Sequence, residues 1–270
     1  MTTVDLSAID AFKAKQREGW AYFAPLETIT TPPAARLVRF AGIKAGQRVL
    51  DVGCGTGVAA LTAAIKGAKV TGLDLTPELL ARAKENTAAT GMQVDWHEGD
   101  VEQLPFADGE FDVVISQFGH MFAPRPEVAI AQMLRVLKNG GTIAFSTWPP
   151  EVSVGRMFAL VGRYAPPPPP GVSSPPQWGD PNIVRERLGD KVKDLRFARD
   201  TMVIAALNAR AHRLNFEHTS GPVRKLVESL EQSDPAKLEA FRREYEALVT
   251  EELEDNQIKQ SYLMTRAIKV

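Results

Sequence analysis

The chain has 270 residues, of which 44% are hydrophobic and 24% charged, as is usual for a soluble globular protein of one large domain or one and a half. Lys plus Arg (32) almost balances Asp plus Glu (33), so the composition indicates neither a nucleic-acid partner nor an anionic membrane surface. The single cysteine, Cys54, excludes an intramolecular disulfide and a cysteine-rich metal site, and no metal is predicted. Without a secretory signal or an apolar run of about 18 residues, we expect a cytoplasmic protein with no membrane span.

Residues 1–36 are predicted to form a helical and aromatic N-terminal flap. Trp20, Tyr22 and Phe23 crowd together there, and they either anchor a helix or close over a substrate. Pro32 and Pro33 follow, and because proline is favoured in the first turn of a helix, we expect a helix to begin near Pro33.

Residues 37–150 predict a core in which short apolar strands alternate with helices. The strands and helices are expected, in chain order, at Arg48–Val52, Val58–Lys66, Lys69–Leu75, Pro77–Ala89, Gln93–His97, Phe111–Ser116, Glu127–Leu137 and Thr142–Thr147. Such alternation is typical of βαβ units, and therefore of a parallel sheet with helices on both faces.

Residues 151–270 no longer show the regular alternation of short apolar strands and helices. Five consecutive prolines, 166–170, predict a stiff surface connection. Strand character returns at Leu195–Ile204 and Ser261–Val270, and these segments are separated by a helical stretch over 208–255. That stretch carries an apolar stripe at helical spacing, made of Leu238, Phe241, Tyr245, Leu248 and Leu253.

The first predicted strand runs into a glycine-rich turn, Gly53-Cys54-Gly55-Thr56-Gly57. In an open α/β sheet, ligands bind beyond the carboxyl ends of the strands, and the first turn is a usual place. The dinucleotide pattern G-x-G-x-x-G is not met, because Val58 occupies its last position, and no P-loop is present. Asp74, at the end of the second strand, suits the two hydroxyls of a ribose. A nucleoside without a pyrophosphate fits this pattern.

These motifs, taken in order, resemble those of class I S-adenosylmethionine-dependent methyltransferases, of the branch that includes the ubiquinone and menaquinone biosynthesis enzymes. The resemblance covers residues 48–147. It rests on Leu50–Gly57, Gly72-Leu73-Asp74, Gly99-Asp100 with Leu104-Pro105-Phe106, Phe111-Asp112-Val113-Val114 and Leu134–Gly141.

The resemblance implies S-adenosylmethionine as cofactor and a role for each matching residue. Asp51 and the turn at Gly53, Cys54, Gly55 and Gly57 would hold the methionine part. Asp74 would bind the ribose and Leu75 would pack on the adenine. In the loop after the third strand, which carries Asp100, Val101 and Glu102, Asp100 would accept from the adenine amino group. Ser116 and Gln117 would line the methionine amino end.

The resemblance also implies a doubly wound, Rossmann-like sheet of seven strands, mostly parallel, with an antiparallel last pair at 195–204 and 261–270. The helical insertion 208–255 departs from the minimal family fold. Because it leaves and returns at one sheet edge and must bury its stripe, we expect it to form a lid that roofs an acceptor site together with residues 10–33.

Methyl transfer from a sulfonium is an in-line displacement, so the protein must mainly align the reactants and exclude water. His120 follows the fourth strand and is the candidate catalytic residue, either as a base or to position the acceptor; a loop histidine that only makes hydrogen bonds is the alternative.

The expected acceptor is a small, apolar or aromatic molecule. Three other functions remain open at this point: a sensor that binds S-adenosylmethionine without turnover, an RNA or protein methyltransferase, and, against the glycine spacing, a nicotinamide dehydrogenase. We expect a monomer or a homodimer.

Overall fold

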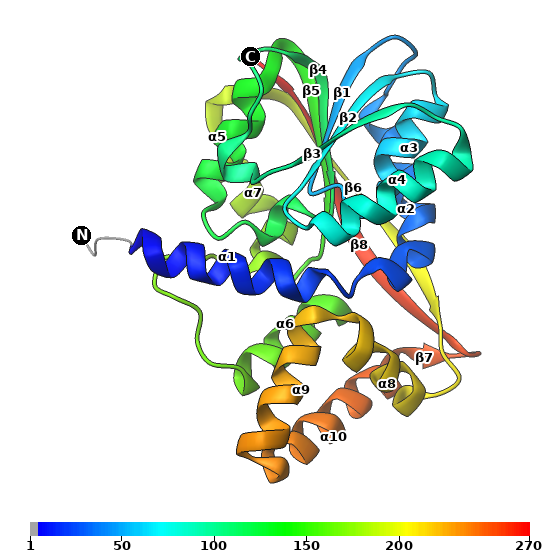
Figure 1. The fold of residues 1–270 in the computed structure, drawn as a ribbon, viewed down its shortest axis with the longest axis vertical. Helices are drawn as coiled ribbons and strands as arrows, with labels where there is room; N and C mark the ends of the chain where they lie inside the picture. The colour runs from blue at the N-terminus through cyan, green and yellow to red at the C-terminus, as the bar shows by residue number, and fades with distance from the viewer. Residues whose placement is uncertain (1–4) are drawn as a thin grey trace.

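The computed structural model describes residues 5–270 and contains one central twisted sheet (Figure 1). Its strand order is β3-β2-β1-β4-β5-β8-β6, in which β8 and β6 are antiparallel to their neighbours and the others are parallel. The strands are β1 (Arg48–Val52), β2 (Lys69–Asp74), β3 (Val94–Glu98), β4 (Phe111–Gln117), β5 (Leu137–Thr147), β6 (Val192–Ala205) and β8 (Gln257–Lys269). The predicted seven-stranded, mostly parallel sheet with an antiparallel last pair is thus confirmed. A two-residue strand, β7 (Leu253–Glu254), pairs with β8 in addition.

Helices cover both faces of this sheet (Figure 1). On one face lie α2 (Glu27–Ala41), α3 (Val58–Ile65) and α4 (Pro77–Thr90); on the other lie α5 (Pro126–Val136) and α7 (Pro181–Leu188). Val49, Leu50, Val114 and Ile115 of the central strands are fully buried, as expected for strands that are covered on both sides.

A second layer of helices lies beyond the carboxyl ends of β1, β2 and β4, and we call it the cap (Figure 1). It consists of α6 (Ser153–Tyr164), α8 (Ala209–Thr219), α9 (Gly221–Ser233) and α10 (Pro235–Glu252). The helix α1 (Leu6–Trp20) runs between the sheet layers and the cap. The helical stretch predicted over 208–255 consists of the three helices α8, α9 and α10.

Two dipeptides explain where the cap helix α10 and the sheet helix α7 begin. Asp180 and Asp234 each accept a hydrogen bond from a backbone N–H of the first turn, and each is followed by a proline at the first helical position. An aspartate cap satisfies an N–H that has no partner within the helix, and proline lacks an N–H that would need one.

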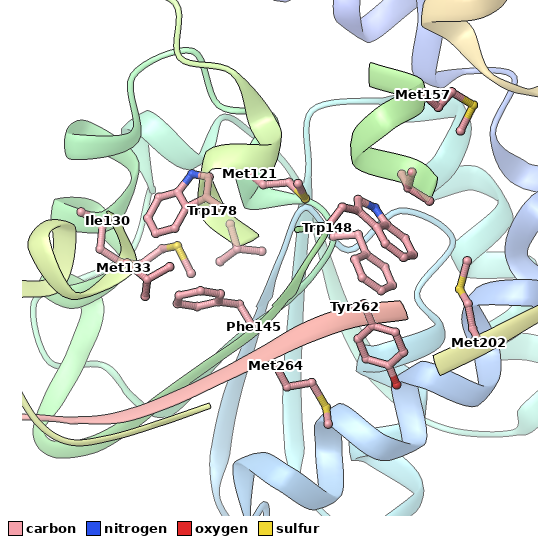
Figure 2. Packing of buried hydrophobic residues seen from close by; sticks show 14 of the residues in the cluster. Met121, Ile130, Met133, Phe145, Trp148, Met157, Trp178, Met202, Tyr262 and Met264 are labelled. Carbon is pink, nitrogen blue, oxygen red and sulfur yellow. The ribbon is translucent and has the colours of Figure 1, made fainter. Parts of the chain in front are cut away.

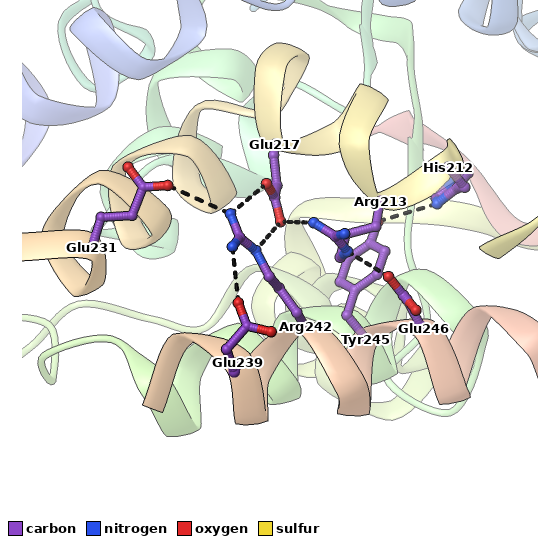
Figure 3. Close-up of polar contacts among 8 residues, drawn as sticks. All are labelled: His212, Arg213, Glu217, Glu231, Glu239, Arg242, Tyr245 and Glu246. Carbon is purple, nitrogen blue, oxygen red and sulfur yellow. Dashed lines mark hydrogen bonds and ion pairs between the residues drawn. The ribbon is translucent and has the colours of Figure 1, made fainter. Parts of the chain in front are cut away.

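A buried ion-pair network joins the cap helices (Figure 3). The Glu217 carboxylate of α8 accepts from Arg213 at 2.5 Å and from Arg242 of α10 at 3.0 Å, and Arg213 also donates to Glu246 at 2.7 Å. These charges are all paired, so the cap tolerates them in its interior. The network therefore links α8 to α10 through buried side chains.

The predicted helix start near Pro33 is wrong. The helix α2 begins at Glu27 and contains Pro32 and Pro33. Each proline removes one N–H donor, so the carbonyl four residues earlier loses its helical hydrogen bond. Because Pro32 and Pro33 lie near the start of α2, the carbonyls concerned belong to its first turn, where water or neighbouring groups can satisfy them.

Within residues 5–270, no helix is long and apolar enough to cross a membrane. No group of three or more His, Cys, Asp and Glu side chains in the same range is arranged to hold a metal ion.

Candidate active site

A cavity of about 230 Å³ lies between the carboxyl ends of the parallel strands and the cap. Its floor is formed where β1 and β4 are neighbours, which is the point at which the strand order reverses. Loops diverge from such a point in an α/β sheet, and ligands bind there. One end of the cavity is polar and the other apolar.

Most of the residues predicted to hold a cofactor line the polar end. They are Asp51, Gly53, Cys54, Gly55, Asp74, Leu75, Asp100, Val101 and Gln117. Four strand ends, those of β1, β2, β3 and β4, and the turns that follow them bring these residues together from a span of 67 positions in the sequence, from 51 to 117.

Gly57, Glu102 and Ser116 were predicted with this group but do not line the cavity. Gly57 packs against the Trp96 ring, and the Glu102 carboxylate is buried in ion pairs. The Ser116 hydroxyl donates to the Val52 carbonyl at 2.6 Å and accepts from the His120 N–H at 2.9 Å. These three residues hold the walls in place.

Asp74 is anchored by the backbone around it. One carboxylate oxygen accepts from the Gly55 N–H at 2.8 Å and the other from the Thr76 N–H at 2.9 Å. Burial raises the pKa of Asp74, and these two amides offset the rise in part. The hydrogen bonds tie the glycine turn after β1 to the end of β2.

Asp51 is the most polar feature of the cavity wall. Neither of its carboxylate oxygens has a hydrogen-bond partner among the described residues. Burial raises its pKa to about 8, and the charge of Asp74 adds to this. A buried carboxyl group without a partner is costly, and a cation at the cavity wall would relieve the cost.

The Gln117 carboxamide is oriented by α2. Its Nε2 donates to the Thr30 carbonyl at 2.6 Å, and Oε1 is buried without a partner among residues 5–270. This leaves an unused acceptor beside Asp51, on the same wall.

The apolar end is lined by aromatic and aliphatic side chains from the loops, the cap and the last strands. Trp148, Met157 and Met202, which are labelled in Figure 2, are among them. The further members of this end are Trp20, Phe23, Leu26, Ile29, Phe122, Val154, Phe158, Val161, Phe216 and Val223, with Gln260 adding a carboxamide.

A strained residue connects the two ends. Phe118, directly after β4, has φ 58°, a backbone conformation that is rare outside glycine and asparagine. Its ring stacks on Trp148 with centroids 4.0 Å apart and an interplanar angle of 8°. Stacking holds Phe118 in this conformation, and strain of this kind is common where a site needs a fixed wall.

His120 lines the cavity, and its buried ring packs against aromatic residues behind the cavity wall. Its centroid lies 4.5 Å from that of Phe145 and 4.7 Å from that of Trp178, and neither of these residues lines the cavity (Figure 2 shows both across the sheet from Trp148). Both ring nitrogens are buried without partners, and burial lowers the pKa of His120 to about 3. The ring is therefore neutral at pH 7, and its role toward an acceptor stays a prediction.

The roof of the cavity comes from the insertion and the N-terminal segment, as predicted. Phe216, Ser220, Pro222 and Val223 of the insertion line the cavity opposite the polar end. The lid prediction is confirmed in this respect.

The reason given for the lid was incomplete. Of the predicted stripe, Leu238, Phe241 and Tyr245 are buried where α10 packs on α6, α8 and α9, Leu248 is half-buried, and Leu253 is half-buried in β7. None of the five lines the cavity. The helix α10 therefore packs against the cavity-lining helices α6, α8 and α9 without contacting the cavity itself.

Sequence reasoning placed some aromatic residues correctly and missed others. Trp20 and Phe23 line the cavity, whereas Tyr22 lies on the surface under Arg224. Trp148 and the α6 residues were missed. The signal available was the apolar spacing of Val154, Met157, Phe158 and Val161, directly after the fifth strand.

Comparison with known proteins agrees with this geometry. A family model described as "Methyltransferase domain" matches residues 49–141. An uncharacterised protein of Mycobacterium tuberculosis is 36% identical over 257 residues, which is 94% of this chain and 93% of the relative. A ubiquinone biosynthesis O-methyltransferase of Dechloromonas aromatica is 36% identical over 166 residues, 60% of this chain and 71% of the relative.

Among solved structures, a putative methyltransferase from Bacillus halodurans superposes with a TM-score of 0.58 at 22% identity, over 87% of this chain and 98% of the other. This likeness confirms the fold. With the sequence relatives it defines the class of protein: this chain belongs to the class I S-adenosylmethionine-dependent methyltransferases. The methyl donor of an enzyme of this class is S-adenosylmethionine.

Proposed function

We propose that this protein transfers the methyl group of S-adenosylmethionine to a small, apolar or aromatic molecule by in-line displacement. The observation that carries the proposal is a single cavity with a polar end at the strand ends and an aromatic end under the cap. The donor belongs at the first end and the acceptor at the second.

The polar end fits the donor. The unpartnered carboxylate of Asp51 and the free Gln117 Oε1 offer two acceptors to the ammonium group of the methionine part. Asp74, which backbone amides hold in place, has lone pairs left for the ribose hydroxyls, and Asp100 offers an acceptor to the adenine. When bound, the donor supplies an activated methyl group on a cationic sulfur.

The apolar end serves the reaction by shape and by excluding water. Trp148, Phe158 and Phe216 surround it, and none of the side chains assigned to it above is titratable. Methyl transfer gains most from alignment of the nucleophile with the methyl carbon and the sulfur, which such walls supply. We therefore expect an acceptor that needs no strong base from the protein: an acidic phenol or a thiol, which ionises near neutral pH, or an amine that is nucleophilic in its neutral form.

The relatives named as ubiquinone biosynthesis O-methyltransferases support oxygen as the first atom to test. A panel of phenols, followed by thiols and amines of similar size, is the direct experiment. The purified protein is incubated with each compound and S-adenosylmethionine, and S-adenosylhomocysteine and the methylated product are measured by mass spectrometry. A small-molecule cell extract serves as an unbiased acceptor mixture.

Two variants test which end of the cavity binds the donor and which binds the acceptor. Phe158→Ala should raise KM for the acceptor and leave donor affinity unchanged, because Phe158 lies only at the apolar end. Asp74→Ala should raise KM for the donor, because it weakens donor binding, and should leave KM for the acceptor nearly unchanged. If the wild-type protein binds the donor but methylates nothing in the panel or the extract, the proposed methyl transfer is wrong and a sensor role replaces it.

A further inference from the structure

One lysine of α1 is buried at the polar end of the cavity. Lys13 Nζ lies 2.6 Å from Asp100 Oδ2 and 2.5 Å from Glu102 Oε2, and its side chain is only 10% exposed. Lysine is rarely buried to this extent unless its charge is paired. The two carboxylates belong to the turn after β3, 87 and 89 residues further along the chain. The contact therefore ties the N-terminal helix to the donor-binding edge of the sheet.

Lys13 completes the orientation of Asp100. The other Asp100 oxygen, Oδ1, accepts from the Glu102 N–H at 2.8 Å. With one oxygen held by this amide and the other by Lys13, the carboxylate cannot rotate, and its remaining lone pairs have fixed directions. Asp100 lines the cavity, so Lys13 determines how this carboxylate faces a ligand.

The contact can open without leaving a buried charge alone. Glu102 also accepts from the Arg125 backbone N–H at 2.7 Å and from Arg125 Nε at 2.8 Å. Arg125 lies directly before α5 and is not part of α1, so Glu102 keeps this ion-pair partner when α1 moves away. Asp100 then faces the cavity. The cost of separating Lys13 is therefore moderate, in contrast to a buried ion pair with no second partner.

Apart from Lys13, α1 is held mainly through its C-terminal half: Gln16 Nε2 donates to the Phe122 carbonyl at 3.1 Å, the Trp20 ring packs on Phe122, and Lys225 of α9 donates to the Lys15 carbonyl. Few of its residues are deeply buried. Of its fifteen residues only Ile9, Lys13 and Gly19 are buried. Arg17 pairs with Glu98 at 2.8 Å, but both side chains are about half exposed, at 44% and 49%. Segments with few buried apolar contacts open at the lowest free energy in a protein. Lys13, Gln16 and Trp20 of α1 nevertheless line the cavity, so α1 covers whatever is bound there.

We propose that Lys13 is a positioning residue of the donor site that couples docking of α1 to donor binding. With α1 docked, Lys13 fixes Asp100 for the adenine end of the donor, and the donor in turn stabilises the docked helix. Coupling of this kind is reciprocal, so donor binding must shift the equilibrium between open and docked α1 toward the docked state by the factor by which docking strengthens donor binding. The inference concerns donor binding alone and is independent of the identity of the acceptor.

The test uses the full-length protein and S-adenosylhomocysteine as the ligand. In Lys13→Met, which keeps the apolar stem, titration calorimetry should show about ten- to hundredfold weaker binding, the range for one hydrogen bond to a charged group. Hydrogen exchange in residues 6–20 should slow when the ligand binds to wild-type protein and stay unchanged in the variant. Lys13→Arg, which keeps the charge, should restore most of both effects.

Arg17→Gln is the matched control, because it removes an exposed ion pair between the same helix and the same edge of the sheet. Exposed pairs contribute little, so affinity should stay within about threefold of wild type. Equal loss in Arg17→Gln and Lys13→Met, wild-type affinity in a folded Lys13→Met, or exchange in α1 that ignores the ligand would each overturn the proposal. Circular dichroism and the melting temperature without ligand establish that each variant is folded.

Discussion

Donor binding should release a proton from Asp51. In the ligand-free protein the pKa of this buried carboxyl group is about 8, so at pH 7 it is mostly protonated. Pairing with the ammonium group of the donor favours the charged carboxylate and lowers its pKa. At pH 7 close to one proton per bound donor should therefore leave the protein.

The pKa of Asp51 also determines how steeply donor affinity depends on pH. Below pH 8, donor affinity should rise about tenfold for each pH unit, because binding selects the ionised fraction of Asp51. The α-amino group of the donor itself loses its proton near pH 8, with a usual pKa of about 7.7–8.0, so affinity should fall again above that pH. The profile is bell-shaped with its maximum near pH 8.

The same shift acts on stability without ligand. Folding raises the pKa of Asp51 from 3.8 to about 8, so the folded state binds this proton more tightly than the unfolded state does. The resulting stabilisation is complete below pH 3.8 and is lost as the pH rises toward the folded pKa. Between pH 4 and 7 the ligand-free protein should lose up to about 4 kcal/mol through Asp51, from 1.36 kcal/mol per pKa unit. Asp51→Asn should not show this loss.

Calorimetry in buffers of different ionisation enthalpy measures the released protons, and titrations from pH 6 to 9 measure the affinity profile. Asp51→Asn is the control: it should lack the rising limb and keep the fall above pH 8. A flat affinity between pH 6 and 7.5 in the wild type, or a rising limb that survives in Asp51→Asn, refutes the assignment. The second outcome would point to Asp74, the other carboxyl group here with a raised pKa.

Three further predictions follow from the geometry. Asp74→Ala should weaken donor binding about tenfold or more in a folded protein, because a charge-assisted contact is lost, and calorimetry measures this. Gly119→Ala places a methyl group 2.4 Å from the Gly53 carbonyl oxygen, so thermal denaturation should show a loss of about 1–3 kcal/mol, and donor affinity should fall as well. His120→Ala should lower the unfolding free energy by about 2–4 kcal/mol in urea titrations, and no ionisation near pH 6.5 in the rate profile should belong to His120.

The sheet and the polar end of the site are predictable from the sequence because both depend on local patterns. Strand ends with Asp51, Asp74 and Asp100 follow short apolar runs, and parallel strands bring their carboxyl ends to one edge. Strand and helix limits in the core agree with prediction to within one residue, except that β5 begins at Leu137 and not at Thr142.

The cap was less predictable because its shape depends on tertiary contacts. The helical pattern over 208–255 does not by itself place the breaks at Ser220 and Asp234, which divide the stretch into α8, α9 and α10. The Asp234-Pro235 pair, an N-cap followed by a proline, was a readable start signal. The pairing of Lys13 with Asp100 and Glu102 has no local signal at all, since it joins residues almost ninety positions apart.

The two sides of the cavity differ in how firmly they are held. On one side, Gly53 and Gly119 approach so closely that neither position has room for a side chain, and the Phe118 ring is stacked on Trp148. On the other side, α1 contributes few buried apolar contacts. In-line transfer requires the methyl carbon and the nucleophile to be placed accurately, and a rigid wall supplies this. Entry of the donor requires an opening, and a helix with few deeply buried residues supplies that. We infer that the fixed wall sets the reaction geometry, and that α1 sets when the site is closed to water.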